Sequence, residues 1–380
     1  MLTSFYKSAT IIYKNMLKEL PKKWWKWLFI FILVIIILYV IYWWLIYEWI
    51  KIRNKQIMER AKIPLGSKTI MVTGGASGIG YAYSNALLDC GYNVVIVDIK
   101  NALESAEKLE QINPNRKGRV HGIEGDVSDM NSMRNAFNKA NEYAKDGVLD
   151  AVILNAGIDL PIYENDEQII KTNLLGPIYG TELYVKQITK NLSEKPPIEK
   201  DYQVIITGSL ASFIPIDMNL SPAYDASKAG IGQFVRSYKP FSTRYNFRIN
   251  AVCPAGMVET GLTKPFIKTT VERIGMLAYM TAEGRGGLMQ PEQMVPGMLD
   301  VLTDKKFNGD LIAVQPNLSF ISRLEPRDEG RAFMEYGEYE ENKSYATKAY
   351  IDYKINNEYL GHRNHVSSSF PSDSSSVFSS

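Results

Sequence analysis

The chain has 380 residues, of which 46% are hydrophobic, and its 43 basic and 41 acidic side chains leave a formal charge of +2. This length can bury one large α/β core and still leave residues for further segments. The near-neutral charge gives no strongly basic surface, so we expect no nucleic-acid partner. The two cysteines, Cys90 and Cys253, are too few for a disulfide framework, and no cysteine or histidine cluster has the spacing of metal ligands. We therefore expect no metal.

An unbroken apolar and aromatic run extends over residues 27–47. About 20 such residues let a helix cross a bilayer, and tryptophan and tyrosine flank both ends of the run, as in membrane helices. A cleaved signal peptide fits less well, because the run is too long and no small-residue cleavage site follows it. A buried core helix rarely lacks polar residues over this length. We expect a basic segment at 1–26, a transmembrane helix at 27–50 and a linker at 51–67.

The charges beside the apolar run do not decide its orientation, because both flanks are equally basic. Asn-x-Ser sequons occur in the chain and would suit a lumenal domain, but an Asn-rich chain contains several by chance. The lack of paired cysteines favours the cytosol. We expect a single-pass membrane protein of the endoplasmic reticulum whose following domain lies in the cytosol.

From residue 68 onward, short β runs alternate with helical stretches. Apolar runs rich in valine and isoleucine predict buried parallel strands at 69–72, 93–97, 151–154, 203–206 and 248–252. Helical patterns lie near 79–90, 129–145, 165–192 and 223–240. This alternation predicts one Rossmann-type α/β domain, a doubly wound parallel sheet, over residues 68–325. Residues 326–380 are polar and end in a serine-rich run, so we expect a largely disordered tail.

A glycine-rich sequence, Thr73-Gly74-Gly75-Ala76-Ser77-Gly78-Ile79-Gly80, follows the first predicted strand and opens a helix. Its glycines permit a tight turn and a close approach of backbone to phosphate, and the helix N-terminus offers N–H donors. A glycine turn without a ligand is the alternative. Asp98 ends the second strand, where a carboxylate can accept both ribose hydroxyls and repel a 2′-phosphate. We expect NAD, with NADP as the less favoured cofactor.

Tyr224 and Lys228 lie four residues apart in a predicted helix and therefore share one face. A cation beside a phenol favours the phenolate and lowers the tyrosine pKa, which suits a general acid or base. The same spacing is common in surface pairs on amphipathic helices. Together with a nucleotide loop, the pair indicates hydride-transfer chemistry.

These motifs and several others resemble the short-chain dehydrogenase/reductase family, in order and spacing, over about residues 68–315. The motifs are Thr73-Gly74-x-x-x-Gly78-Ile79-Gly80, Gly125-Asp126-Val127, Asn155-Ala156-Gly157, Asn173, Ser209, Tyr224-x-x-x-Lys228 and Asn250-Ala251-Val252-Cys253-Pro254. Within the family, the sequences around Asp98 and Ser209 resemble the NAD-dependent hydroxyprostaglandin dehydrogenase branch.

The resemblance implies a role for each matching residue. Tyr224 is the general acid/base, Lys228 lowers its pKa and holds the nicotinamide ribose, and Ser209 binds the substrate oxygen. Asn173 bends its helix and holds a water that links Lys228 to solvent. The residues implied to contact the cofactor are Gly74, Ser77, Gly78, Ile79, Gly80, Asp98, Asp126, Val127, Asn155, Tyr224, Lys228, Pro254 and Thr260.

Some of these assignments keep an alternative. Ser212 could take the place of Ser209, and Asp126 and Asn155 could instead cap the turns that follow them. The interval from Ser209 to Tyr224 exceeds the usual family spacing by a couple of residues, so the loop through residues 217–219 should bulge outward. The sequence from Pro254 to Thr260 is also one residue longer than the common pattern.

Residues 257–300 occupy the place of the family's substrate loop and are rich in methionine and other apolar residues, which suits a greasy substrate or ordinary helix packing. We expect the interconversion of a secondary alcohol and a ketone on an apolar, lipid-like substrate. The alternatives are an NADPH-dependent ketolipid reductase and a non-catalytic, membrane-tethered NAD(H) sensor or scaffold. Self-association into a homodimer through the helices near 165–192 and 223–240 is compatible with each.

Overall fold

The computed structural model describes residues 24–159, 165–190, 200–213, 221–244, 247–254, 257–258, 260, 288–315 and 320–324. The chain divides into two compact units, Met1–Glu325 and Pro326–Ser380, and every described residue belongs to the first. The expected disordered tail, the loop expected to bulge and most of the methionine-rich stretch lie outside the described residues.

One sheet of eight strands forms the centre of the described residues, in the order β10-β9-β6-β5-β4-β1-β2-β3. The strands are β1 (Thr69–Thr73), β2 (Asn93–Asp98), β3 (Val120–Glu124), β4 (Ala151–Leu154), β5 (Tyr202–Thr207), β6 (Phe247–Pro254), β9 (Leu311–Gln315) and β10 (Phe320–Leu324). All are parallel except β10, which pairs antiparallel with β9 at one edge. The predicted doubly wound parallel sheet is confirmed, and β3, β9 and β10 extend it beyond the five strands predicted from the sequence.

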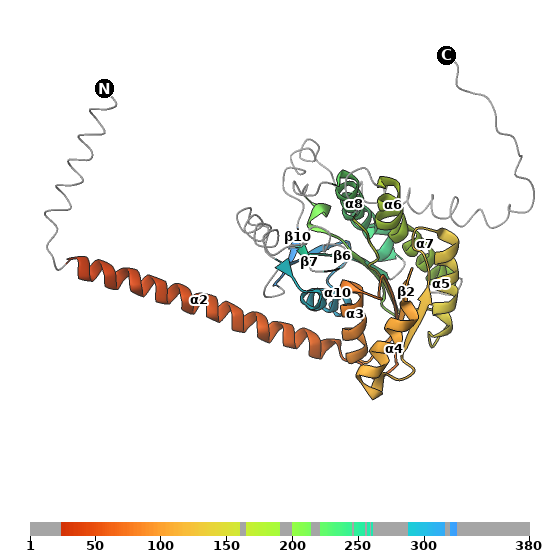
Figure 1. The fold of residues 1–380 in the computed structure, drawn as a ribbon, viewed down its shortest axis with the longest axis horizontal. Helices are drawn as coiled ribbons and strands as arrows, with labels where there is room; N and C mark the ends of the chain where they lie inside the picture. The colour runs from red at the N-terminus through yellow and green to blue at the C-terminus, as the bar shows by residue number, and fades with distance from the viewer. Residues whose placement is uncertain are drawn as a thin grey trace, which may run out of the picture. The chain divides into compact units, whose positions relative to one another are not determined.

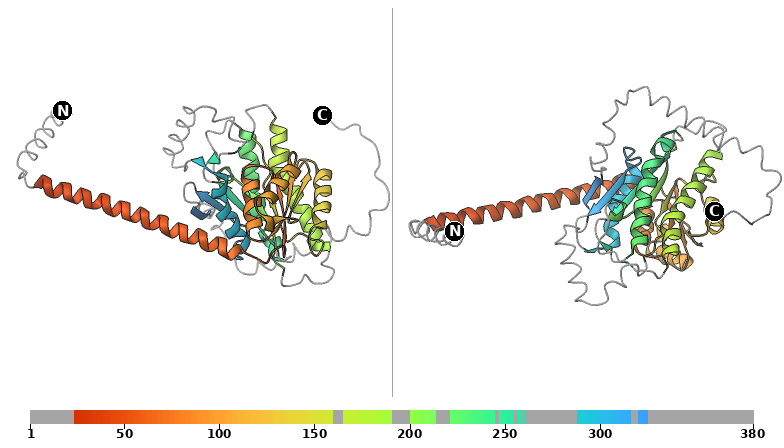
Figure 2. Two further views of the ribbon diagram at one scale, coloured as in Figure 1. Left: turned by 60° about the horizontal axis from the view of Figure 1, so that its bottom comes forward. Right: turned by 90° about the horizontal axis from the view of Figure 1, so that it is seen from above.

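Helices cover both faces of the sheet (Figure 1, Figure 2). On one face lie α3 (Gly78–Asp89), α4 (Ala102–Ile112) and α10 (Val295–Thr303). On the other lie α5 (Met130–Glu142), α7 (Gly176–Lys190) and α8 (Pro222–Arg244). Since side chains alternate along a strand, Ile70 and Val72 of β1 join the first core and Met71 joins the second. The sheet is thus buried on both faces, which explains its β-branched composition.

A single helix, α2 (Trp24–Ala61), contains the apolar run and continues into the domain. Large hydrophobic side chains are exposed along residues 27–49, and by length and composition the helix can cross a membrane. The segment 51–67, expected to be a linker, is helical as far as Ala61, and Ile57 and Ala61 are buried in the core with α3 and α10. The linker expectation was wrong over these residues, because apolar side chains at helical spacing face the domain and no glycine or proline interrupts the helix.

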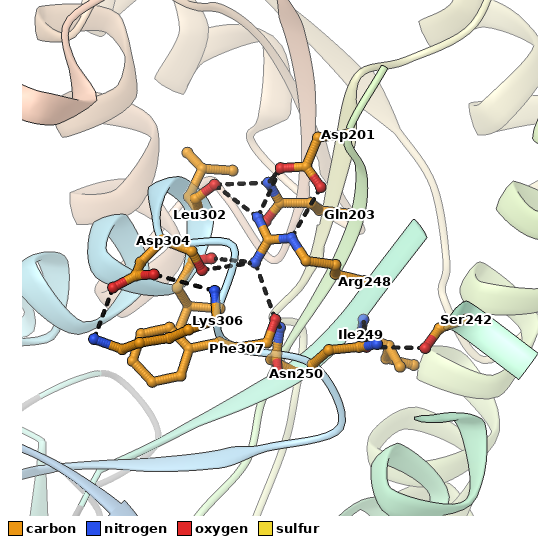
Figure 3. A network of polar contacts seen from close by, with 12 residues as sticks. Asp201, Gln203, Ser242, Arg248, Ile249, Asn250, Leu302, Asp304, Lys306 and Phe307 are labelled. Atoms are coloured by element: carbon orange, nitrogen blue, oxygen red, sulfur yellow. Dashed lines mark hydrogen bonds and ion pairs between the residues drawn. The ribbon is translucent and has the colours of Figure 1, made fainter. Parts of the chain in front are cut away.

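The parallel strands begin at one edge of the sheet, here called the amino edge, where Arg248 fixes the end of α10 (Figure 3). The buried Arg248 guanidinium, at the start of β6, pairs with Asp201. It also donates to four carbonyl oxygens at or just after the end of α10, those of Val301, Leu302, Asp304 and Phe307. The strands end at the opposite edge, here called the carboxyl edge, where ligands bind in open parallel sheets.

Candidate functional site

The predicted site residues gather at the carboxyl edge. The strand ends there are Thr73 of β1, Asp98 of β2, Leu154 of β4, Thr207 of β5 and Pro254 of β6. The glycine-rich loop follows β1, and Asn155 and Ser209 follow β4 and β5 within two residues. The topology of the sheet therefore brings residues as far apart in sequence as Thr73 and Pro254 to one edge.

The glycine-rich loop requires glycine at specific positions. Gly74 and Gly78 have positive φ angles of 63° and 53°, which residues other than glycine rarely adopt. A Cβ on Gly80 would lie 2.2 Å from the carbonyl oxygen of Gly74, and one on Gly74 would lie 2.8 Å from the Cα of Ala156. The loop is thus packed closely against the end of β4. It leads directly into α3, whose N-cap side chain, Ser77, caps no described backbone amide. An uncapped helix N-terminus of this kind suits a pyrophosphate.

The Asp98 carboxylate is held against the glycine-rich loop. Its Oδ2 accepts a hydrogen bond of 3.0 Å from the backbone N–H of Ala76, and its Oδ1 accepts one of 3.4 Å from that of Lys100. The residue is partly exposed at the end of β2. A fixed carboxylate at this position can accept hydrogen bonds from a ribose and opposes a phosphate on it.

Asn155 joins three strand ends. Its Nδ2 donates to the carbonyl oxygens of Thr73 and Gly74, both at 3.2 Å, and its Oδ1 accepts a 2.9 Å bond from the hydroxyl of Thr207. Its backbone N–H donates to the hydroxyl of Thr73. The amide is thus engaged with the protein on both sides, and it fixes the loop that begins at Gly74.

Asp126 forms a local turn. Its Oδ1 accepts hydrogen bonds from the backbone N–H and the hydroxyl of Ser128, at 2.8 and 2.7 Å, and its own N–H donates to Ser132. This is the turn-capping arrangement that the sequence left open as an alternative. Val127 is buried against Gly176 at the start of α7 and is part of the hydrophobic core.

Asn173 lies in a π-helical turn, Lys171–Leu175, between α6 (Asp166–Ile170) and α7. A bend at this residue is what the family resemblance implied, since π-turns interrupt the regular helix. The buried Asn173 side chain accepts from the N–H of Ile158 at 2.8 Å and donates to its carbonyl oxygen at 2.7 Å. This pair of bonds fixes the loop after β4 beside Lys228, since a Cβ on Gly157 would lie 3.8 Å from the lysine Nζ.

Tyr224, Lys228 and Ser209 meet where α8 packs on the end of β5. The Ser209 side chain lies close enough to Tyr224 to favour the phenolate and lower the phenol's pKa. The Nζ of Lys228 lies 5.7 Å from the centre of the Tyr224 ring and donates a 2.8 Å hydrogen bond to the carbonyl oxygen of Thr207. Ser212 points elsewhere, because its hydroxyl accepts from the Ser209 N–H and interacts with Cys253. The phenol, hydroxyl and ammonium therefore form one compact polar group.

Burial dominates the protonation of this group. It raises the pKa of Tyr224 to about 12, to which nearby Asp159 and Asp225 add while the Ser209 side chain opposes them. Burial likewise lowers the pKa of Lys228 to about 8. Desolvation of the phenol sets the net direction of the Tyr224 pKa shift, and the expected lowering of this pKa by Lys228 stays a prediction.

Two further predicted residues lie at the mouth of the glycine-rich loop. The side chain of Thr260 lies over Gly78, since a Cβ on that glycine would be 3.0 Å from the threonine Cγ2. Pro254 ends β6 and is partly exposed. Thr260 follows β7 (Met257–Val258), which pairs with β8 (Leu288–Met289) in a separate two-stranded sheet.

Sequence reasoning assigned no role to three residues that the structure places in the site. Thr207 holds both Lys228 and Asn155. Cys253 is buried directly behind Ser209, where burial raises its thiol pKa to about 12. The charge of Asp159 adds to the rise in the Tyr224 pKa and partly opposes the fall in the Lys228 pKa. Position at or just beyond a strand end was the available signal for all three.

Comparisons with known proteins agree with this geometry. The family model described as short chain dehydrogenase matches residues 68–270. The 15-hydroxyprostaglandin dehydrogenase [NAD(+)] of Bos taurus is 30% identical over 262 residues, which cover 66% of this chain and 91% of the relative. The crystal structure of gox2181 matches with a TM-score of 0.56 at 24% identity, covering 68% of this chain and 96% of that one. The Pseudomonas aeruginosa RhlG/NADP complex also matches with 0.56, at 20% identity, covering 68% and 98%. The chain therefore belongs to the short-chain dehydrogenase/reductase family and is an oxidoreductase of that family.

Proposed function

We propose that this oxidoreductase is anchored in a membrane and interconverts a secondary alcohol and a ketone on an apolar, lipid-like substrate with NAD. The observation that carries the proposal is the polar group at the carboxyl edge. The Ser209 side chain lies beside Tyr224 and lowers its pKa, and the buried Lys228 lies next to the phenol ring. Thr207 and Asn155 connect this group by hydrogen bonds to a loop whose glycines and helix N-terminus suit a dinucleotide.

The side chains divide the chemistry between them. The hydroxyls of Ser209 and Tyr224, which belong to one group at the carboxyl edge, would both bind the substrate oxygen and so orient the carbon that bears it. In the oxidising direction Tyr224 takes the hydroxyl proton as the carbonyl forms, and in the reducing direction it returns that proton. The bound nicotinamide would accept or supply the hydride. Lys228, held by Thr207, places a positive charge next to the phenol and stabilises its deprotonated form.

Asp98 supports NAD over NADP as the cofactor. Its carboxylate is fixed at the end of β2 by the N–H of Ala76, and a 2′-phosphate placed there would meet a like charge. The bovine relative is named as an NAD(+) enzyme, whereas the RhlG structure is a complex with NADP. An NADPH-dependent ketone reductase is the alternative, and it requires that Asp98 does not reach the ribose.

The apolar helix supports the membrane anchor and, with it, a lipid-like substrate. Residues 27–49 of α2 expose large hydrophobic side chains, and the bovine relative is named for a hydroxylated prostaglandin. Both cysteines are free and buried, which is compatible with a domain in the cytosol. Our proposal therefore comprises a single-pass anchor at 27–50 in the endoplasmic reticulum, a cytosolic catalytic domain at 68–325 and a polar tail at 326–380.

The test uses the full chain in mild detergent, because α2 contributes to the core. Absorbance of the reduced cofactor is followed with NAD⁺ and NADP⁺ over sterols, retinols, hydroxy fatty acids, sphingoid bases and short alcohols, beside Tyr224→Phe. We expect turnover of apolar secondary alcohols with NAD⁺ and a loss of about 10²-fold or more in the variant. Tyr143→Phe, an exposed tyrosine remote from the site, is the matched control. Cofactor binding without turnover on any class would favour a tethered NAD(H) sensor, and turnover of small polar alcohols alone would exclude a lipid-like substrate.

A further inference from the structure

The end of α2 lies at the amino edge of the sheet. Directly after the helix, the N–H of Ile63 donates to the carbonyl oxygen of Cys90 at 2.8 Å, and that of Gly66 donates to Gly91 at 2.7 Å. Cys90 and Gly91 connect the end of α3 to the beginning of β2, so they lie where the strands begin. The chain then enters β1 from this same edge. Followed backwards from Ala61, α2 therefore runs away from the amino edge.

Contacts with α10 give the same direction independently. The Asp300 carboxylate is 4% exposed and pairs with Arg53, at 3.1 Å, and with Arg60. Arg60 also donates to the hydroxyl of Thr303 at 3.0 Å. The later residue of α2 thus contacts the later residue of α10, so the two helices run in the same direction. Since Arg248 fixes the end of α10 at the amino edge, both helices run from the carboxyl edge towards the amino edge.

The length of the docked segment places the apolar run relative to the site. From Ile50 to Ala61 the helix rises about 16 Å, at about 1.5 Å per residue. A five-residue strand such as β1 is also about 16 Å long, at about 3.3 Å per residue. The run of exposed apolar side chains extends to Trp49, and Ile52 is one further exposed residue within the docked segment. The run therefore begins about one strand length from the amino edge, at the level of the carboxyl edge.

The junction between the apolar run and the domain contains no flexible joint. No glycine or proline interrupts α2 from Trp24 to Ala61. Ile57 and Ala61 are buried in the same core as α10. A carboxylate as deeply buried as Asp300 requires its partners, since an unpaired buried charge is strongly destabilising. The helix and the domain therefore turn together.

We propose that the carboxyl edge, with its candidate site, faces the bilayer from which α2 emerges, so that an apolar substrate enters the site from the membrane. This rests on the membrane anchor of the proposed function, in which the exposed apolar run of α2 lies in the lipid bilayer.

Environment-sensitive fluorophores on single introduced cysteines test this orientation in the full chain. The two sites are Gln290, just before η6 (Pro291–Met294) and α10, and Lys305, just after α10; both are exposed. They are separated by about 20 Å along the helix. Cys90 and Cys253 are buried and should not react. The protein is reconstituted into phosphatidylcholine vesicles that contain lipid spin-labelled at the headgroup or, in separate vesicles, deep in the acyl chain. Leu38 in the apolar run is the reference position for the acyl-chain label, because the middle of a bilayer lies about 15 Å from the headgroups.

We expect the labels at Leu38 and Gln290 to be quenched and the label at Lys305 not to be quenched. Equal quenching at Gln290 and Lys305, or stronger quenching at Lys305, would overturn the orientation. No quenching at Leu38 would overturn the anchor and the orientation together. Turnover measured on the same vesicles separates this inference from the proposed chemistry. Turnover without the difference between the two labels contradicts only the orientation, whereas the difference without turnover contradicts only the enzyme.

Discussion

The carbonyl oxygen of Thr207 accepts a 2.8 Å hydrogen bond from the ammonium of Lys228 and so ties the buried cation to the end of β5. The hydroxyl of the same threonine donates to Asn155, whose amide holds the carbonyl oxygen of Gly74. One chain of hydrogen bonds thus connects the lysine to the glycine-rich loop. Because the middle of this chain belongs to two strand ends, the acid/base group and the nucleotide loop are fixed to the same rigid element.

Lys228→Met should change how stability depends on pH. The pKa of Lys228 falls from its ordinary value of 10.5 to about 8 in the native state. Between these values the unfolded chain binds more protons than the native one, so the stability of the wild type rises with pH. Below this pH window, the lowered pKa of Lys228 reduces the free energy of unfolding by about 3 kcal/mol, at about 1.4 kcal/mol per pH unit. We expect the melting temperature of the wild type, relative to that of the variant, to rise from about pH 7 to about pH 10.

Thermal unfolding followed by circular dichroism measures this difference, with Lys186→Met, an exposed lysine on α7, as the control. Stopping at about pH 10 keeps Tyr224, whose pKa is about 12, protonated throughout. A melting-temperature difference that does not vary with pH would mean that Lys228 is not desolvated in the native state.

Asp159→Asn should shift the pH profile of alcohol oxidation towards acid. Oxidation needs the phenolate, so its rate should rise with pH while Tyr224 has a pKa of about 12. The charge of Asp159 contributes to that high pKa, and its removal should favour the phenolate by about one pH unit or less. kcat/KM measured against pH for the wild type, the variant and the exposed Asp166→Asn control tests this. An unchanged profile would show that the loop after β4 lies too far from the phenol to act on it.

Much of the site could be predicted because its residues follow strands that the sequence marks clearly. Runs such as Val94–Val97 are buried on both faces, and burial of this kind leaves a continuous apolar signature. The ends of such runs then locate Asp98 and the glycine-rich loop without any tertiary information. α10 and β9 escaped prediction because their apolar residues follow the methionine-rich stretch without a clear break in pattern.

Features that depend on packing between distant segments could not be predicted. Whether Ser209 or Ser212 faces the phenol depends on the short 3₁₀ turn Leu210–Ser212, which turns the second hydroxyl back to the first residue's N–H. The sign of the Tyr224 pKa shift depends on burial by several elements, whereas the sequence displays only the neighbouring cation. The docking of residues 51–61 depends on Asp300, about 240 residues away in sequence, which no local pattern announces.

Asp98→Ser should weaken the preference for NAD⁺. The substitution removes the charged carboxylate that opposes a 2′-phosphate and that now accepts from the Ala76 N–H. We expect the ratio of kcat/KM for NAD⁺ to that for NADP⁺ to fall by about tenfold or more, as removal of one like-charge contact allows. Glu124→Gln, an exposed carboxylate at the end of the neighbouring strand β3, is the control. A ratio that Asp98→Ser leaves unchanged would place the ribose elsewhere and restore the NADPH-dependent alternative.

Asp300→Asn should loosen the end of α2 without affecting the acid/base group. The variant leaves Arg53, whose side chain is 25% exposed, without its buried counter-charge, at a cost of about 1–3 kcal/mol because Arg60 remains partly solvated. We expect faster hydrogen exchange at the backbone amides of residues 50–61 and a lower melting temperature. Glu59→Gln, which breaks an exposed pair with Lys62 just after the helix, should change neither, because exposed pairs contribute little. Equal exchange in Asp300→Asn and the wild type would show that apolar packing of Ile57 and Ala61 alone holds the helix to the domain.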